Sequence, residues 1–377
     1  MKYEFTWITK QEKFNLIKNK WKTIFEKDIN SSIFLSWEWV SNWWKIFSNS
    51  KSLEILTVYN QSKNELIAIL PLYKSRSKIL CLNLMWEWRF IGSDSIACSD
   101  HLGILTQTNL EQEEFNLIFD ELLKNIGDFA VLKLTDLQPT DPIIKNIISW
   151  AKNHSIKVKI EPDTTCPCVE LSNTWDDYLM RLSSNFRSQI RSSYRKILNN
   201  DDMTIRSVTD NQEIIKYINE LAKLNISRMD QKNQKSSFLQ QTMQQFLVNL
   251  ATDMVQTGQA WLDIILHENR LVAASLHLVH RNTVYYYQGG FDPEYSKWRP
   301  STVLFAHVMQ RAIENEYIYF DFLRGNEKYK YRWGASQKEN ITILLLPDNI
   351  LNRAGYTLSK YINKAINVTR KISSVFH

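Results

Sequence analysis

The sequence predicts a two-domain α/β (α+β) protein in which mixed central sheets are flanked by helices. The chain has 377 residues, which is more than one hydrophobic core usually serves. Apolar residues make up 44% of it and charged residues 23%, an ordinary balance for a folded globular protein. Runs with strand periodicity and runs with helical periodicity alternate in both halves, which is typical of sheets covered by helices.

The first half opens with helical material and then alternates strand and helix. A helix is expected to begin near Ser36, a suitable N-cap, and to place Trp39, Trp43 and Trp44 on one face. Two apolar runs joined by the polar turn 60–65 predict an antiparallel hairpin. The expected elements are strands at 53–59, 66–73, 88–92, 102–105 and 129–134, and helices at 111–125 and 142–153.

A linker is expected at 161–167, where Pro162 and Pro167 bracket a polar stretch in which a helix cannot continue. After it the predicted order is a basic helix, a strand, two helices, three strands, a helix and two strands. We therefore predict domains at 1–163 and 164–348, followed by a basic amphipathic helix at 349–377. The expected elements are strands at 203–208, 259–267, 271–280, 283–290, 317–323 and 341–346, and helices at 184–199, 212–229, 238–255 and 300–315.

Composition also sets expectations for compartment and partners. No apolar run reaches the roughly 20 residues that span a bilayer, and the first residues do not resemble a secretory signal. The cysteines do not have zinc-site spacing, so we expect a cytoplasmic protein with reduced thiols and no metal. The net charge of +6 is concentrated at 178–200 and 349–377, which suggests an anionic ligand or surface. The four cysteines are Cys81, Cys98, Cys166 and Cys168.

Two long motifs carry a resemblance to a known family. The stretch 289–295 reads GGFDPEY and is followed by a helix that begins with proline, and the stretch 320–334 reads FDFLRGNEKYKYRWG. Weaker support comes from FLSWEW at 34–39, RFIGS at 89–93 with SDH at 99–101, and Phe-Arg at 186–187. The chain resembles the GNAT-like acetyltransferases of the cellulose-biosynthesis (CelD-like) type, which are related to FemAB aminoacyltransferases. The resemblance spans most of the chain and implies tandem GNAT-like domains, of which the first is degenerate.

The resemblance implies that acetyl-CoA or another acyl-CoA is the co-substrate. Phosphate groups bind readily at helix N-termini, so the pyrophosphate is expected at the helix that begins with Pro300. Ser301 and Thr302 would add hydroxyl groups there, and Lys297 and Arg299 would add charge. Relatives usually have Ser-Pro-Gly-Thr at this turn, whereas this chain has Arg-Pro-Ser-Thr, so the mode of carrier binding stays open. The alternative is that the turn only starts a helix.

Two glycines in the first motif are also expected to contact the carrier. By resemblance, the strands before and after the Pro300 helix diverge and the pantetheine arm pairs with exposed backbone between them. Gly289 and Gly290 suit this arrangement because a residue without Cβ allows close approach or a bulge. The alternative is a turn that ends the strand.

The second motif supplies the expected substrate-binding residues. Arg324, Lys330 and Arg332 are suited to hold an anionic substrate, and aromatic residues such as Trp333 are suited to wall a sugar or an acyl group. The alternative is an internal network in which Arg324 pairs with Asp321 or Glu327. Trp39, from the N-terminal signature, completes the expected substrate-binding residues by resemblance.

Transfer to an amine needs a base for the amine proton and a donor to stabilise the oxyanion. Glu327 is the candidate base and Tyr329 the candidate acid. Asp100 and His101 are the competing pair and would reach across from the N-terminal domain. No Ser-His-Asp or Cys-His arrangement is apparent in the sequence, which favours direct transfer over a covalent enzyme intermediate.

Three functions are therefore under comparison. The first is an N-acyltransferase that acts on a small-molecule or saccharide amine, such as an amino sugar of surface-polysaccharide synthesis. The second is a FemAB-like transferase that uses aminoacyl-tRNA, and the third is a non-catalytic scaffold of a polysaccharide synthesis complex. Arg187, Arg191 and Arg195 share one helix face and are either solvated or in contact with phosphates. The helix at 349–377 is expected to pack on the body, with peripheral membrane contact as the alternative.

Overall fold

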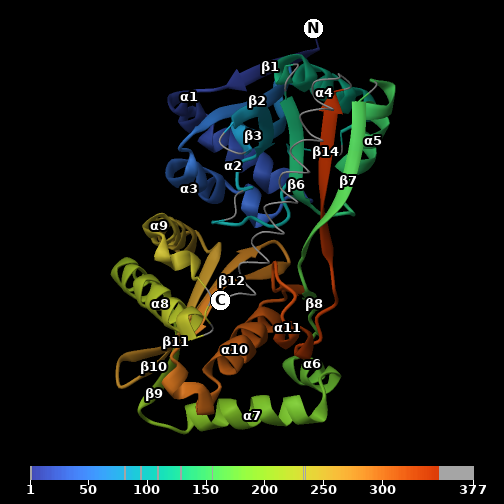
Figure 1. Cartoon of the computed structure of the whole chain (residues 1–377). Coiled ribbons are helices and arrows are strands. Elements are labelled where there is room, and N and C mark those ends of the chain that lie inside the picture. The colour runs from blue at the N-terminus through green and yellow to red at the C-terminus, as the bar shows by residue number, and fades with distance from the viewer. Residues whose placement is uncertain are drawn as a thin grey trace, which may run out of the picture.

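The structure is a computed structural model that describes residues 2–347 except 80–81, 94–95, 108–109, 128–129, 155, 232 and 234. The helix predicted at 349–377 and Cys81 lie outside the described residues. Two sheets with their helices form two bodies, one above the other in Figure 1. The predicted α/β class, with mixed sheets flanked by helices, is confirmed.

The first sheet has the strand order β1-β2-β3-β4-β6-β14-β7, and β5 pairs with β3. All pairs are antiparallel except β4 with β6. Its strands are β1 (Tyr3–Ile8), β2 (Lys51–Asn60), β3 (Glu65–Ile79), β4 (Leu82–Phe90), β5 (Leu105–Thr106), β6 (Ala130–Leu137), β7 (Ile156–Thr165) and β14 (Glu339–Pro347). Its helices are α1 (Gln11–Leu16), α2 (Lys18–Lys27), α3 (Trp37–Phe47), α4 (Gln112–Ile126) and α5 (Ile143–Asn153), with a 3₁₀ turn η1 (Ile33–Leu35).

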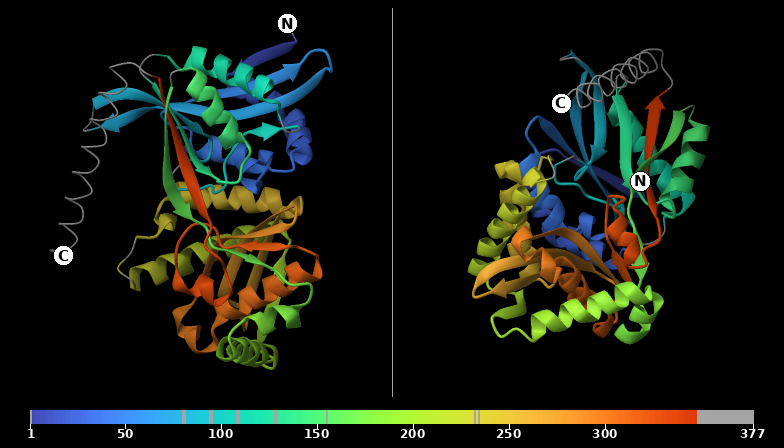
Figure 2. Two further views of the ribbon diagram at one scale, coloured as in Figure 1. Left: turned by 90° about the vertical axis from the view of Figure 1, so that its right-hand side faces the viewer. Right: turned by 60° about the horizontal axis from the view of Figure 1, so that its bottom comes forward.

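The second sheet has the order β8-β13-β12-β11-β10-β9. Helices α8 and α9 pack on β10, β11 and β12, and α10 also packs on these three strands, with α7 beyond it (Figure 2). Its strands are β8 (Cys168–Glu170), β9 (Met203–Val208), β10 (Ala260–His267), β11 (Arg270–His280), β12 (Thr283–Phe291) and β13 (Tyr319–Asp321). Its helices are α6 (Trp175–Arg181), α7 (Ser184–Leu198), α8 (Asn211–Gln231), α9 (Gln241–Gln256), α10 (Pro300–Glu314) and α11 (Lys328–Arg332), with 3₁₀ turns η2 (Ser237–Leu239) and η3 (Pro293–Trp298).

One hydrophobic core joins the two bodies. Helix α3 packs against α9, and its Trp39 ring lies 5.2 Å from Phe246 and 5.1 Å from Tyr287 in edge-on contacts. Ser36 caps α3, since its hydroxyl accepts a hydrogen bond from the backbone N–H of Trp39 at 3.2 Å. The predicted N-cap is therefore confirmed, and the cap fixes the helix that carries the contact between the bodies.

The last strand corrects one expectation about the domains. The strand expected at 341–346 was assigned to the C-terminal domain, but β14 pairs with β6 and β7 of the first sheet. The chain therefore crosses between the bodies twice, once out along β7 and once back along β14 (Figure 1). The expected linker at 161–167 begins within β7, which tolerates Pro162 because an edge strand has one side without ladder hydrogen bonds.

Shorter elements also differ from the prediction. Residues 3–8 form β1 rather than opening the chain with a helix, and α6, α11 and β8 were not predicted. Tertiary pairing decides these cases, because three to seven residues carry too little periodicity to show their structure in isolation.

Candidate active site

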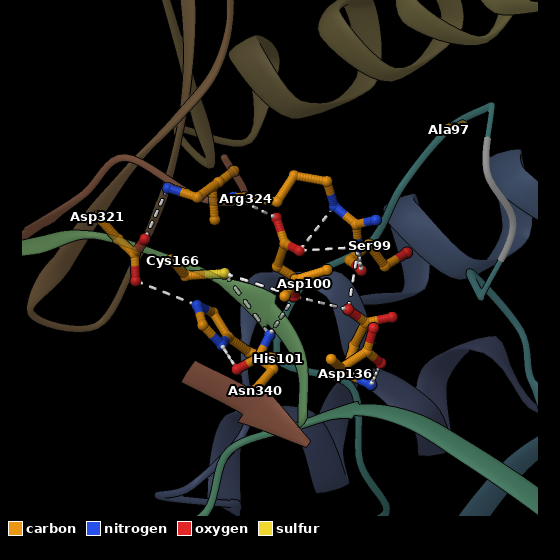
Figure 3. A network of polar contacts seen from close by, with 12 residues as sticks. Ala97, Ser99, Asp100, His101, Asp136, Cys166, Asp321, Arg324 and Asn340 are labelled. Atoms are coloured by element: carbon orange, nitrogen blue, oxygen red, sulfur yellow. Dashed lines mark hydrogen bonds and ion pairs between the residues drawn. The ribbon is translucent and has the colours of Figure 1, made fainter. Parts of the chain in front are cut away.

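An ion-pair network lies at the contact between the two bodies (Figure 3). Arg324 follows β13, and its side chain reaches the first body. Its Nε donates to Asp100 Oδ1 at 2.9 Å, and its Nη2 donates to the Ser99 carbonyl at 2.8 Å and to Asp136 Oδ1 at 3.0 Å. Its backbone N–H also donates to Asp100 Oδ2 at 3.2 Å. The guanidinium is therefore engaged by three residues of the other body.

Asp136 is the member of this network that most readily holds a proton. Burial raises the pKa of Asp136 to about 7, although Arg324 acts in the opposite direction. Burial also lowers the pKa of Arg324, but the charges of Asp100 and Asp136 outweigh it and hold that pKa above its usual value. Arg324 therefore stays charged with Asp100 as its closest partner, while Asp136 titrates near neutral pH.

His101 forms a second link between the bodies. Its Nε2 lies 3.1 Å from Asp321 Oδ2 and its Nδ1 lies 3.0 Å from Asn340 Oδ1. Both partners are oxygen atoms, so the doubly protonated imidazolium satisfies both contacts. Burial lowers the pKa of His101, but the charge and hydrogen bond of Asp321 outweigh it and raise the pKa overall. A buried imidazolium that is held on both sides is a poor general base.

A cavity of about 600 Å³ opens beside the network. It lies where β12 leaves β13, because the two strands pair only from Thr283 to Tyr285 and from Tyr319 to Asp321. Its lining combines residues of the loop 96–100, the end of α8, strand β12 and the segment 322–330. The lining residues are Ile96, Cys98, Asp100, Asn225, Arg228, Met229, Ser237, Tyr286, Tyr287, Gln288, Gly289, Phe322, Leu323, Arg324, Glu327, Tyr329 and Lys330.

The backbone of β12 is irregular at this cavity. His277 of β11 pairs with Tyr286, and the preceding Leu276 pairs with Gln288, so Tyr287 is an extra residue in β12. A β-bulge of this kind bends the strand and redirects side chains, and bulges are frequent beside active sites. The bulge brings Tyr286, Tyr287 and Gln288 together on the cavity lining.

Comparison with known proteins identifies the part of the chain that supplies most of this cavity's lining. Residues 184–331 match the family model described as Acetyltransferase (GNAT) domain. The chain contains a GNAT acetyltransferase domain. Such a domain indicates an N-acyltransferase enzyme. No curated protein matches the sequence.

Solved structures share the fold over nearly the whole chain. FemX has a TM-score of 0.65 at 12% identity, and the match covers 94% of this chain and 99% of FemX. A conserved protein of unknown function from Bacteroides thetaiotaomicron has a TM-score of 0.59 at 9% identity, with 91% and 99% covered. L-PGS from Bacillus licheniformis has a TM-score of 0.53 at 10% identity, with 91% and 96% covered. At these identities the similarity concerns the fold.

Glu327 and Tyr329 both line the cavity of the GNAT domain. The Glu327 side chain is 56% exposed, and its Oε2 lies 3.0 Å from Lys330 Nζ. Gly325, at φ +112°, makes room for the Glu327 carboxylate, because a Cβ on this glycine would overlap that carboxylate. Burial raises the pKa of Tyr329 well above its usual value, so its phenol stays protonated and can donate a hydrogen bond.

Lys330 has a different environment from the one expected of a substrate-binding residue. It is buried, and its Nζ donates to the carbonyls of Leu323, Arg324 and Gly325 at 3.1, 2.8 and 3.0 Å. Three carbonyls use the three donors of an ammonium group. Lys330 therefore holds the turn that carries Arg324 and Glu327.

The structure places three other expected substrate-binding residues away from the cavity lining. Trp39 is buried, and its Nε1 donates to Ser99 Oγ at 2.8 Å, which supports the loop before Asp100. Trp333 is buried against Phe186 with a ring distance of 5.0 Å. Arg332 donates to Gln189 on α7 at 2.8 Å. Sequence motifs grouped these residues with the cavity, but packing directs their side chains elsewhere.

The two glycines make close contacts, as expected, but with protein atoms. A Cβ on Gly289 would overlap the hydroxyl of Tyr286, and a Cβ on Gly290 would lie 3.1 Å from Leu221 of α8. Gly289 lines the cavity, whereas Gly290 packs beneath it. The expected contact of both glycines with a carrier remains a prediction.

The predicted pyrophosphate turn forms as a helix start. Pro300 is the first residue of α10, and the N-cap Arg299 has left-handed backbone angles (φ +53°, ψ +52°) and no side-chain cap hydrogen bond. Ser301 and Thr302 are half-buried, and Lys297 Nζ lies 5.9 Å from the Trp298 ring centre. The first turn thus has the unpaired amides that an anion uses, outside the lining of the 600 Å³ cavity.

The sequence did not indicate several cavity residues. Arg228 lies at the end of α8 with its guanidinium 5.1 Å from the Phe291 ring centre, and it lowers the pKa of both Tyr286 and Tyr329, which burial raises. Burial raises the pKa of Tyr286 to about 12. Nothing in the sequence indicates that Arg228 or Asn225 belongs to a site, because both residues lie within an ordinary amphipathic helix.

A separate groove of about 340 Å³ follows the exposed face of α7. Arg187, Arg191 and Arg195 line it together with serines of the same helix, so the predicted common face is confirmed. Arg191 pairs with Asp176 at 3.2 Å, and Arg187 donates to backbone carbonyls of α6.

No helix among the described residues is long and apolar enough to cross a membrane. No group of three or more His, Cys, Asp or Glu side chains in the described ranges has a geometry that could hold a metal ion.

Proposed function

We propose that this chain transfers an acyl group from acetyl-CoA or another acyl-CoA to an amine, and that the transfer takes place in the 600 Å³ cavity. The observation that supports this most is the position of the cavity. It lies where β12 and β13 separate, most of its lining residues belong to the matched acetyltransferase segment, and the lining includes the Glu327 carboxylate and the half-buried phenols of Tyr286, Tyr287 and Tyr329.

Glu327 is the proposed base. Its carboxylate is accessible in the cavity, whereas Asp100 is fully engaged by Arg324 and His101 by Asp321 and Asn340. Only the neutral amine attacks a thioester, so Glu327 accepts the first proton of the ammonium group. Asp100 and His101 then act as positioning residues that fix the loop beside the cavity.

Tyr329 is the proposed acid. Acyl-CoA supplies the thioester, and the amine nitrogen forms the new C–N bond as the C–S bond breaks. The phenol of Tyr329 gives a proton to the leaving thiolate, and the proton lost from the nitrogen restores it. Tyr286 is another protonated phenol of the lining and is suited to donate to the oxyanion.

The residues present fit an acyl-CoA in two places. The first turn of α10, with Ser301, Thr302 and the nearby Lys297 and Arg299, is proposed to hold the pyrophosphate. Gly289 lines the 600 Å³ cavity on β12, and a pantetheine arm that pairs with its backbone would share this place with the Tyr286 hydroxyl, which packs against Gly289. This assignment rests on the helix terminus and the strand separation together.

The acceptor class is proposed from resemblance. The motifs at 289–295 and 320–334 are similar to those of CelD-like proteins, which supports an amino sugar of surface-polysaccharide synthesis as the amine. We place this function in the cytoplasm, where acyl-CoA is available. We propose that residues 1–163 and 164–348 form the two domains, except that β14 belongs to the first.

Thermal unfolding with and without acetyl-CoA tests the proposal. A ligand that binds only the native state raises the melting temperature. We expect a rise with acetyl-CoA that is lost in Arg299→Ala, together with acylation of a glucosamine acceptor that is lost in Glu327→Gln. No rise with any acyl-CoA would contradict the proposal.

A second candidate is transfer from aminoacyl-tRNA, and the α7 groove is the observation that favours it. Its three arginines are spaced along one exposed face, and phosphate contacts dominate nucleic-acid affinity. This candidate predicts a steep loss of activity with added salt and sensitivity to RNase. Transfer from acyl-CoA predicts neither.

A further inference from the structure

A second cavity lies on the other side of the network and has no part in the proposed transfer. Its volume is about 370 Å³, which is within the range of small-molecule sites. His101 and Asp321 belong to its lining, whereas Asp100 and Arg324 line the transfer cavity. The contact between His101 and Asp321 therefore forms part of the wall between the two cavities, which we call the transfer cavity and the second cavity.

The wall of the second cavity that the first body contributes is acidic. Asp28 is 4% exposed, and its two oxygens accept backbone hydrogen bonds from Asn30 and Thr106 at 2.9 and 2.8 Å. Asp141 uses Oδ1 to accept from the Ile143 N–H at 3.0 Å. The lining residues of this wall, all described, include no Lys or Arg.

The second oxygen of Asp141, Oδ2, accepts no hydrogen bond from the residues that the structure describes, and Asp141 lines the cavity. A Cβ on Gly103, which also lines the cavity, would lie 3.5 Å from Asp141 Oδ2. Burial raises the pKa of Asp141 to about 6, and the nearby charge of Asp28 adds to the rise. A positive charge placed here would offset both effects.

The wall that the second body contributes carries positive charge. Lys338 is exposed, with Nζ 5.1 Å from the Tyr319 ring centre. Arg281 is held by its donation to the carbonyls of Glu26 and Asp28 at 2.9 and 2.7 Å. Asp321, the carboxylate on this wall, is already bound to His101. Lys338 is therefore the cation of this wall best placed to bind an anion.

We propose that the second cavity binds a small zwitterion that carries a primary ammonium group and an anionic group. The ammonium lies against Asp141 and Asp28, and the anionic group lies against Lys338. Charged hydrogen bonds at both ends compensate the cost of desolvating such a ligand. A purely apolar molecule would have no use for these charged partners.

The proposal goes beyond acyl transfer, because it concerns a molecule that the enzyme binds without acylating it. The His101–Asp321 contact stands between the ligand and the transfer cavity. His101 follows Asp100 directly in the chain, and Asp321 lies three residues before Arg324. A ligand in the second cavity, whose lining includes His101 and Asp321, is thus positioned to influence the loop and turn that line the transfer cavity.

Ligand-detected NMR with glycine, acetate and methylammonium as probes tests this proposal on the full chain. We expect saturable binding of glycine, with affinity reduced at least tenfold in Asp141→Asn and in Lys338→Gln. Exposed Asp201→Asn and Lys10→Gln are the matched controls and should bind as the wild type does. Acetate and methylammonium each satisfy one end and should bind at least tenfold more weakly than glycine.

The outcomes separate this proposal from the proposed function. Glycine binding that persists in Glu327→Gln supports a site independent of transfer, whatever the fate of acyl transfer itself. Equal binding to the wild type, Asp141→Asn and Lys338→Gln would overturn the proposal, as would the absence of saturable binding. Acylation of glycine by acetyl-CoA that is lost in Asp141→Asn and in Lys338→Gln would overturn the separation of the two cavities.

Discussion

The network around Arg324 and the cavity around Glu327 are adjacent, yet the polar side chains of the network are engaged by protein partners and that of Glu327 is accessible. Arg324 uses its side chain on Ser99, Asp100 and Asp136, whereas Glu327 is half-exposed and has, among the described residues, the ion-pair partner Lys330. A side chain that is fully engaged fixes geometry, and one that is accessible can exchange a proton with a ligand. We therefore expect the Arg324 network to position the site and Glu327 to take part in the proton transfer.

The largest effect is expected when the network is broken. Arg324→Ala leaves the carboxylates of Asp100 and Asp136 without their cation, and removal of one partner of a buried pair costs about 3–5 kcal/mol. Because Asp136 can take up a proton, we expect about 3 kcal/mol of lost unfolding free energy by urea titration. Arg332→Ala, on the exposed side of the same segment, is the control and should cost less than about 1 kcal/mol.

The next effect separates chemistry from position. Glu327→Gln keeps the shape of the side chain but removes the proposed base, so kcat should fall by about 100-fold or more with little change in melting temperature. Asp100→Asn should instead lower stability. If Glu327→Gln keeps its kcat, or loses stability as Asp100→Asn does, the division between the two regions fails.

A smaller effect is expected at the bulge. Gly289→Ala adds a Cβ that overlaps the Tyr286 hydroxyl, and overpacking of this kind costs about 1–3 kcal/mol. Removal of that hydroxyl should relieve the shortest contact, whereas two ring carbons of Tyr286 would stay 2.9 and 3.0 Å from the new Cβ, so the double variant with Tyr286→Phe should regain part of the melting temperature. Additive losses in the double variant would show that the overlap is not the cause.

A further effect is a pH dependence of stability. Burial raises the folded pKa of Asp136 to about 7, above its unfolded value of about 4. The folded state therefore holds the proton more tightly, and the stability it contributes is present at low pH and is lost as pH rises toward 7. Urea titrations between pH 5 and pH 8 should show a shallower decline in Asp136→Asn; identical slopes would contradict the assignment of the proton to Asp136.

The sequence predicted regular elements better than it predicted the site. Long periodic segments such as α8, α9 and α10 were located within a few residues, because periodicity reports burial directly. The place of β14 depended on pairing with β6 and β7, which lie far away in sequence. No local pattern in residues 339–347 indicates that their partners are β6 and β7.

The motifs indicated the region of the site but did not show which of their residues line the cavity. They indicated Asp100, Glu327 and Tyr329, which line the cavity, together with Trp39 and Trp333, which do not. Whether a polar or aromatic side chain is free depends on its neighbours in space, such as the three carbonyls around Lys330. The sequence did not indicate Arg228, because its effect depends on its position near Tyr286 and Tyr329 in the folded chain.

The most direct test of the central claim is to measure whether acyl-CoA occupies the transfer cavity. Cys98 is half-buried on its lining, so its alkylation by N-ethylmaleimide, followed by peptide mass spectrometry, reports occupancy at that position. We predict that saturating acetyl-CoA slows alkylation of Cys98 at least tenfold. An unchanged rate of Cys98 alkylation at saturating acetyl-CoA would contradict the account.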